Sequence, residues 1–159
     1  MKEFGSIAEF IAHIPLMQAE TVLGMHHGLK KCVDAIEKTA KSEFGVYQPG
    51  VGEFGAWAEL ADATKADRLR LGFTENDPLE RTHALEDSVS STIEALQGTV
   101  GSTSEIMVYQ EDGTAHFEPR PVLGPAAVRN LELIKKTFGE AVANGLLYGS
   151  GASKVRLLP

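Results

Sequence analysis

The sequence QAETVLGMHHGLKKCVDAIEKTAKSEF, residues 18–44, decides the first part of the fold. Its apolar residues recur at spacings of three and four, which is the pattern of one buried helical stripe. They are Val22, Met25, Leu29, Val33, Ile36 and Ala40. The spacing predicts a helix of about 40 Å, which is long for a domain with an expected radius of gyration of about 15 Å. We therefore expect that Gly24 and Gly28 break the helix, or that it projects and packs against a neighbour.

The segment upstream of this stretch predicts a short helix of its own. Ser6 is a residue type that often caps a helix, because its side-chain oxygen accepts a hydrogen bond from a backbone N–H of the first turn. Pro15 should stop this helix at Ile14, because a proline disfavours helical geometry in the residue before it. Two separate helices are thus expected before residue 45.

Two loops flank a second predicted helix downstream. The Pro-Gly pair in Tyr47–Gly52 indicates a loop, and the turn-forming residues of Phe73–Pro78 indicate an exposed connection. Between these loops, five residues support a helix that Gly72 would end. They are Trp57, Leu60, Ala61, Thr64 and Leu69.

The middle of the chain predicts a β-hairpin. Residues 88–95 are rich in β-branched side chains, and residues 98–102 follow as a second strand after a tight turn. Val89, Ser91 and Ile93 should share one face of the pleat. The next apolar run, Ile106–Glu111, fits a short helix or a strand, and Asp112-Gly113 indicates a turn in either case.

The last predicted helix begins at Gly124-Pro125, because proline favours the first helical position. Its apolar residues recur at helical spacing; they are Val128, Leu131, Ile134, Phe138 and Val142. Gly145 or Gly149 should end it. Residues 150–159 are expected to form a basic, mobile tail that contains Lys154 and Arg156.

Composition restricts the class of protein. A chain of 159 residues is the size of one domain with one core. The formal charge is −7, with 22 acidic against 15 basic side chains, which argues against tight binding to phosphate backbones. Cys32 is the only cysteine, so an internal disulfide is impossible and cytosolic synthesis is expected. No apolar run approaches the ~20 residues that span a bilayer, and the first residues do not resemble an export signal.

The sequence does not predict catalytic, metal-binding or cofactor-binding residues. His26 and His27 are adjacent on the predicted helix, so their side chains point about 100° apart and cannot easily bind one metal ion. Cys32 lies within the helical stripe, where access is poor. The glycines of Gly50-Val51-Gly52 lack the lysine and hydroxyl residue of a phosphate-binding loop. Neighbouring carboxylates such as Glu86-Asp87 are most often simply solvated. We therefore expect that the protein is not an enzyme.

The densest group of special residues lies between Tyr109 and Ala127. Gly113 allows a positive φ, and two prolines stiffen an extended loop. Arg120 stands between these prolines, which makes it a charge with a low ordering cost at an interface. An ordinary surface loop before a helix is the alternative interpretation.

This segment resembles the tail-completion, or head-to-tail joining, family of long-tailed bacteriophages. Members typically carry Tyr-x-Glu-x-Gly-Thr followed by Arg-Pro-Phe-Leu-x-Pro-Ala. The matching residues here are Tyr109, Glu111, Gly113, Thr114, Arg120, Pro121, Leu123, Pro125 and Ala126. Residues 77–89 resemble the family's Pro-Leu-x-Arg-Thr-Gly-x-Leu-x-x-Ser-Ile stretch. Two residues depart from the pattern, because Val122 replaces a phenylalanine and His83 replaces a glycine. The resemblance covers roughly residues 57–147.

The resemblance implies a single α+β domain over residues 1–159, with a small, mainly antiparallel sheet packed against two or three helices and one long N-terminal helix. It implies a structural virion protein of the phage neck that is assembled in the host cytoplasm. Copies would form a ring, expected to be a hexamer, between the head connector or stopper protein and the tail terminator or tail tube protein. DNA would pass through the lumen without specific binding, and neither a cofactor nor a membrane is implied.

A ring needs two different complementary faces on each subunit. We expect one face to include Tyr109, Glu111, Gly113, Thr114, Arg120, Pro121, Val122, Leu123 and Pro125. The loops Tyr47–Gly55 and Phe73–Pro78 would contribute to the other face or to the head connector. Two further hypotheses remain open. A non-viral soluble protein–protein interaction module would be a stable monomer, and a small hydrolase with catalytic carboxylates would have a cleft with a shifted acidic pKa.

Overall fold

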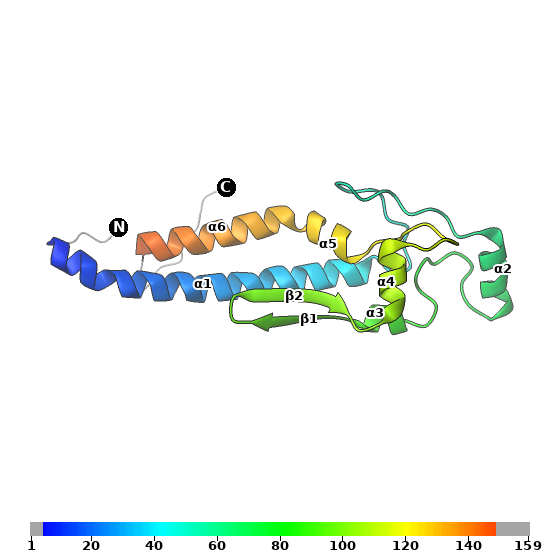
Figure 1. Cartoon of the computed structure of the whole chain (residues 1–159), viewed down its shortest axis with the longest axis horizontal. Coiled ribbons are helices and arrows are strands. Elements are labelled where there is room, and N and C mark those ends of the chain that lie inside the picture. The colour runs from blue at the N-terminus through cyan, green and yellow to red at the C-terminus, as the bar shows by residue number, and fades with distance from the viewer. Residues whose placement is uncertain (1–4, 149–159) are drawn as a thin grey trace. The chain divides into compact units, whose positions relative to one another are not determined.

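The computed structural model describes residues 5–148, so the predicted basic tail of residues 150–159 lies outside the described residues. The described helices are α1 (Ile7–Ser42), α2 (Asp62–Arg70), α3 (Ala84–Asp87), α4 (Glu105–Asp112), α5 (Leu123–Arg129) and α6 (Leu131–Tyr148). The strands β1 (Val89–Glu94) and β2 (Gln97–Ser102) form a two-stranded antiparallel sheet (Figure 1). The expected α+β class with a long N-terminal helix is confirmed.

The chain divides into two compact units. Among the described residues, the first unit contains residues 5–32, residues 93–98 at the hairpin turn, and residues 132–148. The second unit contains residues 33–92 and 99–131. Helix α1 contributes its earlier residues to the first unit and its later residues to the second.

Helix α1 runs through Pro15, so the prediction that this proline ends a short helix at Ile14 was wrong. The predicted cap is confirmed, because Ser6 Oγ accepts a hydrogen bond from the Glu9 N–H at 3.2 Å. Glu9 Oε2 in turn accepts from the Gly5 N–H at 3.0 Å, much as in a capping box. A proline inside a helix removes one backbone hydrogen bond and favours a kink, but the turns on both sides keep their own bonds. The helix therefore continues.

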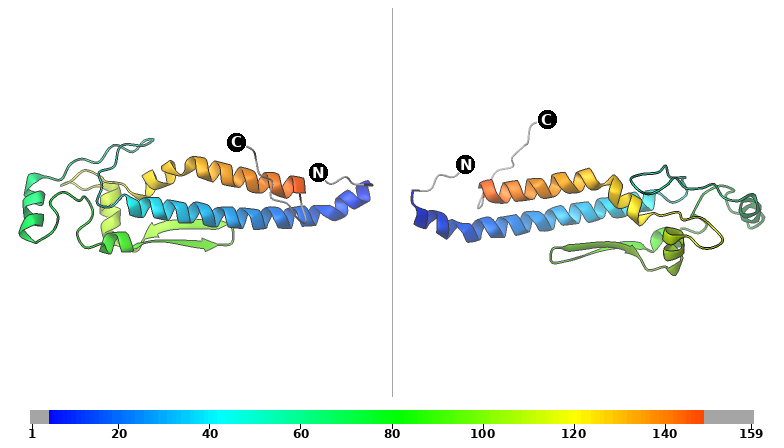
Figure 2. Two further views of the ribbon diagram at one scale, coloured as in Figure 1. Left: turned by 180° about the vertical axis from the view of Figure 1, so that it is seen from behind. Right: turned by 45° about the horizontal axis from the view of Figure 1, so that its top comes forward.

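The glycines of α1 do not break it either, and instead they allow close packing against α6 in the first unit. A Cβ atom added to Gly24 would lie 3.5 Å from Ala141 Cβ, and one added to Gly28 would lie 2.9 Å from Thr137 Cγ2. On α6, a Cβ added to Gly145 would lie only 1.8 Å from Thr21 Oγ1. Residue numbers increase along α1 while those of the contacting residues on α6 decrease, so the two helices pack antiparallel. Figure 2 shows α6 alongside α1 in both views.

The core of the second unit is built from several elements. Its buried apolar residues are Ala40, Phe44, Trp57, Val89, Met107, Val122 and Ala126. The hairpin contributes through β1, where buried or half-buried residues alternate with exposed ones as predicted. The ambiguous run after the hairpin is helix α4, and Met107 is its buried residue. Residues that are distant in sequence thus enclose one apolar centre.

Two predicted helices differ from the observed ones. Helix α2 begins at Asp62, and Trp57 lies before it in an extended segment, where its ring is buried and Nε1 donates to the Pro121 carbonyl at 3.0 Å. The last predicted helix is interrupted at Asn130, between α5 and α6. The Asn130 amide donates to the carbonyl of Ala126 and to Thr39 Oγ1, both at 2.8 Å. The bond to Ala126 is local and competes with helical backbone bonds, and the bond to Thr39 holds the side chain against α1. Helix α6 continues past Gly145 and ends at Tyr148, directly before Gly149, the second of the two predicted stops.

Candidate functional site

The loop that follows α4 is fixed by one carboxylate. Glu111 Oε1 accepts hydrogen bonds from the backbone N–H groups of Val122 and Leu123, each at 2.7 Å. These amides lie at the start of α5, where backbone N–H groups have no partner within the helix and favour a negative charge. The C-terminal turn of α4 therefore caps the N-terminus of α5.

The loop itself depends on Gly113. Its φ is +72°, and an added Cβ would lie 2.9 Å from the nitrogen of Pro119, so a larger residue would be strained and would clash. Thr114 closes the next turn, because its N–H donates to the Phe117 carbonyl at 3.0 Å. The Arg120 N–H then returns to the Gln110 carbonyl at 2.7 Å. The sequence correctly indicated the turn and the positive φ.

The side chain of Arg120 holds a second segment against this loop. Its Nε and one terminal nitrogen donate to the Ala58 carbonyl at 3.3 and 3.0 Å, and the same terminal nitrogen also reaches the Glu59 carbonyl at 3.3 Å. The bond from Trp57 to the Pro121 carbonyl lies beside these contacts. Residues 57–59 and 120–121 are thus tied together.

The residues predicted for one interface face lie in different environments. Val122 is fully buried (0% exposed), and Pro125 is buried as well, so neither side chain can reach a neighbour directly. The side chain of Val122 therefore belongs to the core of the second unit. Tyr109 is 54% exposed on α4 and is open to contact. The structure places Gly113, Thr114 and Arg120 in the loop after α4 and Glu111 in the last turn of that helix, and their place in an interface remains a prediction.

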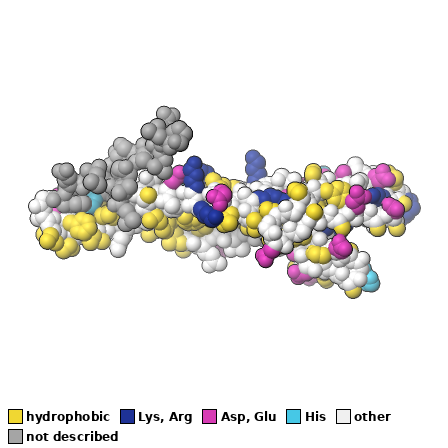
Figure 3. Space-filling view, turned by 90° about the horizontal axis from the view of Figure 1, so that it is seen from above, with side chains coloured by type: hydrophobic (Ala, Val, Ile, Leu, Met, Phe, Trp, Pro, Cys, Tyr) yellow, Lys and Arg dark blue, Asp and Glu magenta, His cyan; other side chains and the backbone are white. Residues whose placement is uncertain are grey.

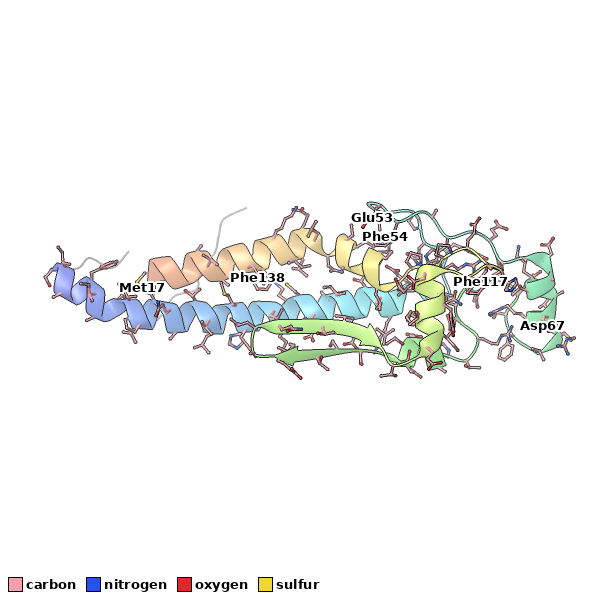
Figure 4. The ribbon with its side chains drawn as sticks, viewed as in Figure 1. Met17, Glu53, Phe54, Asp67, Phe117 and Phe138 are labelled. Atoms are coloured by element: carbon pink, nitrogen blue, oxygen red, sulfur yellow. The ribbon has the colours of Figure 1, made fainter. Side chains whose placement is uncertain are left out.

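A groove of about 800 Å³ in the second unit lies beside this loop. This volume lies in the range of ligand-binding clefts. The large apolar side chains that line it are Leu60, Leu79, Leu85, Ile106 and Phe117. Its ionisable side chains are Arg68, Arg81, Arg120, His83, His116, Glu59 and Glu118. Figure 4 labels Phe117 on the loop after α4.

The groove has an excess of positive charge. Arg68 is only 4% exposed, and its guanidinium bonds to the Thr74 carbonyl at 2.7 Å, to Thr74 Oγ1 at 3.3 Å and to the Glu80 carbonyl at 2.6 Å. In the part of the chain that the structure describes, the guanidinium groups of Arg68 and Arg120 bond to carbonyl and hydroxyl oxygens and not to carboxylates. Neutral acceptors satisfy the donors without forming ion pairs with the two arginines.

One acceptor at the groove is unsatisfied. Gln110 lines the groove, and its Oε1 atom is buried without a hydrogen-bond partner among the described residues. A buried amide oxygen in this state costs about 1–3 kcal/mol.

The rim of the groove contains backbone in a left-handed conformation. His83 has φ +53° and Leu79 has φ +60°, which are uncommon for residues with a Cβ. His83 Nδ1 lies 3.1 Å from the Glu86 carboxylate and 3.2 Å from that of Glu80. The hydrogen bond to Glu86, followed by the charge of Glu80, raises the pKa of His83. The left-handed backbone explains why a glycine would suit position 83.

Sequence reasoning missed most of the groove. Arg68 gave no signal, because a buried arginine within a short polar helix cannot be distinguished from an exposed one by its spacing. Arg81 enters the sequence analysis only through the resemblance, and Ile106 only as part of an ambiguous run. Phe117 follows the turn at Gly113 and could have been suspected as an apolar residue in a structured loop.

The other candidate residues do not form a site in the described part of the chain. Cys32 is buried, and the rings of His26 and His27 are 6.5 Å apart at 81°. Among residues 5–148 no group of three or more His, Cys, Asp or Glu side chains is placed to hold a metal ion. None of the helices in this range is long and apolar enough to cross a membrane.

One strongly perturbed acid lies outside the groove. Burial raises the pKa of Glu43 to about 7, even though the charge and hydrogen bond of Arg129 act in the opposite direction. Glu43 Oε2 is buried without a hydrogen-bond partner among the described residues. Its carboxyl group therefore belongs to the core, beside Arg129.

Comparison of the chain with protein-family models, with curated proteins and with solved structures found no match.

Proposed function

We propose that this protein is a structural component of the neck of a tailed bacteriophage. Copies of the chain form a ring that joins the tail tube to the head connector and lets DNA pass. The observation that carries the proposal is the bond of the Glu111 carboxylate to the amides of Val122 and Leu123. This bond connects the two stretches that resemble the tail-completion family, residues 109–114 and 120–126. Residues shared with that family thus have a common structural role here.

The partners follow from the same resemblance. A hexameric ring would contact a head connector or stopper protein on one side and a tail terminator or tail tube protein on the other. The formal charge of −7 suits a lumen that DNA passes without sticking, because like charges repel and counterion release is absent.

An exposed apolar stripe on α1 supports assembly with other protein chains. Ile7, Ile11, Ile14 and Val22 are exposed and lie on one side of the helix. Figure 3 shows hydrophobic side chains at the end of the molecule where α1 begins. Exposed apolar patches on soluble proteins mark interaction sites. Residues 7–29 contain no lysine or arginine, whereas helices that lie on membranes are usually rich in both, so a protein partner suits this stripe better than a lipid surface.

The proposal is tested by negative-stain electron microscopy of the purified full chain. We expect rings with a central lumen. The double variant Ile11→Glu/Ile14→Glu should reduce the proportion of assembled particles, because it places charge on the apolar stripe. The control Leu96→Glu changes an exposed apolar residue at the hairpin turn and should leave the rings unchanged. A wild-type chain that stays monomeric at all concentrations, as an isolated interaction module would, contradicts the proposal.

A further inference from the structure

The groove is lined by three arginines against two glutamates, so its fixed charge favours an anionic occupant. Arg81 and Arg120 both line it, and the Arg81 side chain is 44% exposed. Arg81 lies 3.5 Å from the Asp67 carboxylate, a long contact, and it also stacks over the ring of Phe73 at 5.5 Å. A carboxylate that entered the groove would meet two guanidinium groups, and charge-assisted hydrogen bonds to guanidinium are among the stronger ones.

An exposed acidic turn exists elsewhere on the second unit. The N–H of Val51 donates to the Phe54 carbonyl at 2.9 Å, and the Phe54 N–H donates back to the Val51 carbonyl at 3.0 Å. Gly52 has φ +59°, which suits the first central position of such a tight turn. The turn places Glu53 in solvent, and Figure 4 labels Glu53 and Phe54 on it.

The turn is rigid before any contact is made. A Cβ added to Gly124 would lie 2.4 Å from the Phe54 ring, so the ring packs directly on the backbone of α5. A Cβ added to Gly52 would lie 3.4 Å from Val128. A preformed turn loses little conformational entropy on binding.

We propose that the groove of one copy receives the Val51–Phe54 turn of a second copy, with Glu53 facing Arg81 and Arg120. This inference rests on the proposed ring. A ring requires a heterologous contact between two different surfaces, and the turn contributes no residue to the lining of the groove.

The lining of the groove favours a protein segment over nucleic acid. Five large apolar side chains line it together with the arginines. Phosphate backbones are bound by clustered lysine and arginine, whereas an apolar lining matches the centre of a protein interface. The half-buried Val51, next to the tip of the turn, supplies an apolar group to such a lining.

The test is a charge exchange, read by sedimentation velocity over a range of concentrations. The chains are wild type, Glu53→Arg, Arg81→Glu and the double variant that carries both changes. Each single variant juxtaposes like charges and should weaken self-association at least tenfold, which is about 1.4 kcal/mol. The double variant restores opposite charges and should recover most of the wild-type association. Glu94→Arg adds the same charge as Glu53→Arg at an exposed position on β1, outside the groove, the turn and the predicted interface loops, and it should associate like wild type.

Thermal unfolding of each variant shows whether it is folded. Single variants that associate like wild type, or a double variant no better than the singles, would overturn the inference. If micrographs show rings in those cases, the proposed ring stands without this contact. If the charge exchange behaves as expected but the assemblies are not rings, the contact stands and the proposed function fails. A chain that never associates overturns both.

Discussion

Glu43→Gln tests whether burial or ion pairing dominates in the core of the second unit. Glu43 is 1% exposed and bonds to Arg129, yet burial raises its pKa to about 7 from an ordinary value of 4.5. The folded chain therefore binds a proton more tightly than the unfolded chain between these pH values. Stability should fall as the pH rises from about 4.5 to about 7, and the loss should be complete above pH 7. At 1.36 kcal/mol per pH unit, the full effect is at most about 3 kcal/mol.

The glutamine variant cannot ionise and does not lose stability in this way. Relative to wild type, Glu43→Gln should gain about 2–3 kcal/mol between pH 5 and pH 8. The measurement is urea unfolding followed by circular dichroism at several pH values. Glu132→Gln is the control, because Glu132 is 85% exposed and pairs with Lys135, and exposed pairs contribute about 0–1 kcal/mol. The dominance of burial would be refuted if the difference in unfolding free energy between Glu43→Gln and wild type did not change with pH. It would also be refuted if the variant became less stable than wild type as the pH rises.

Three further substitutions test packing and backbone conformation. Gly145→Ala should cost about 1–3 kcal/mol in thermal unfolding, because its Cβ would collide with Thr21, whereas Gly139→Ala on the same helix meets nothing within 4 Å and should be neutral or stabilising. Val122→Phe should cost about 1–3 kcal/mol in urea unfolding, because the fully buried valine leaves no room for a ring; unchanged stability would contradict the packing described here. His83→Gly should relieve the left-handed backbone and gain about 0.5 kcal/mol at pH 8.5. The pKa of His83 is raised by its contacts with two glutamates, so these contacts stabilise the folded wild-type chain below pH 6.5. The advantage of the glycine variant should therefore shrink below pH 6.5. An advantage that grows on acidification would contradict this.

The elements with a regular period were predictable from the sequence. The stripe from Val22 to Ala40 identified α1, and the alternation from Val89 to Ile93 identified β1, because both periods arise from burial of one face. The predicted helix boundaries were wrong where one residue can either end a helix or be accommodated within it. Pro15 weakens a helix without having to end it, and Asn130 interrupts one because its amide reaches Thr39, which is distant in sequence.

The groove could not be predicted because it depends on contacts between distant segments. Arg68 can be buried because its guanidinium donates to the backbone carbonyls of residues 74 and 80. Every residue has a backbone carbonyl, so the pattern of side chains in the sequence does not reveal these acceptors. Arg120 was expected at a surface, and its guanidinium bonds within the chain to the carbonyl of Ala58. Gly113 was predictable, since its conformation is a local property of the turn.

Trp57 is the only tryptophan of the chain, and its indole is held in the second unit against the Pro121 carbonyl. Its fluorescence is therefore an intrinsic reporter of this unit, whereas far-ultraviolet circular dichroism is dominated by the helices of both units. Unfolding curves recorded by the two signals coincide when the chain melts in one cooperative step, and they separate when one unit melts before the other. The protein thus contains, without any label, the means to measure how strongly its two units depend on each other.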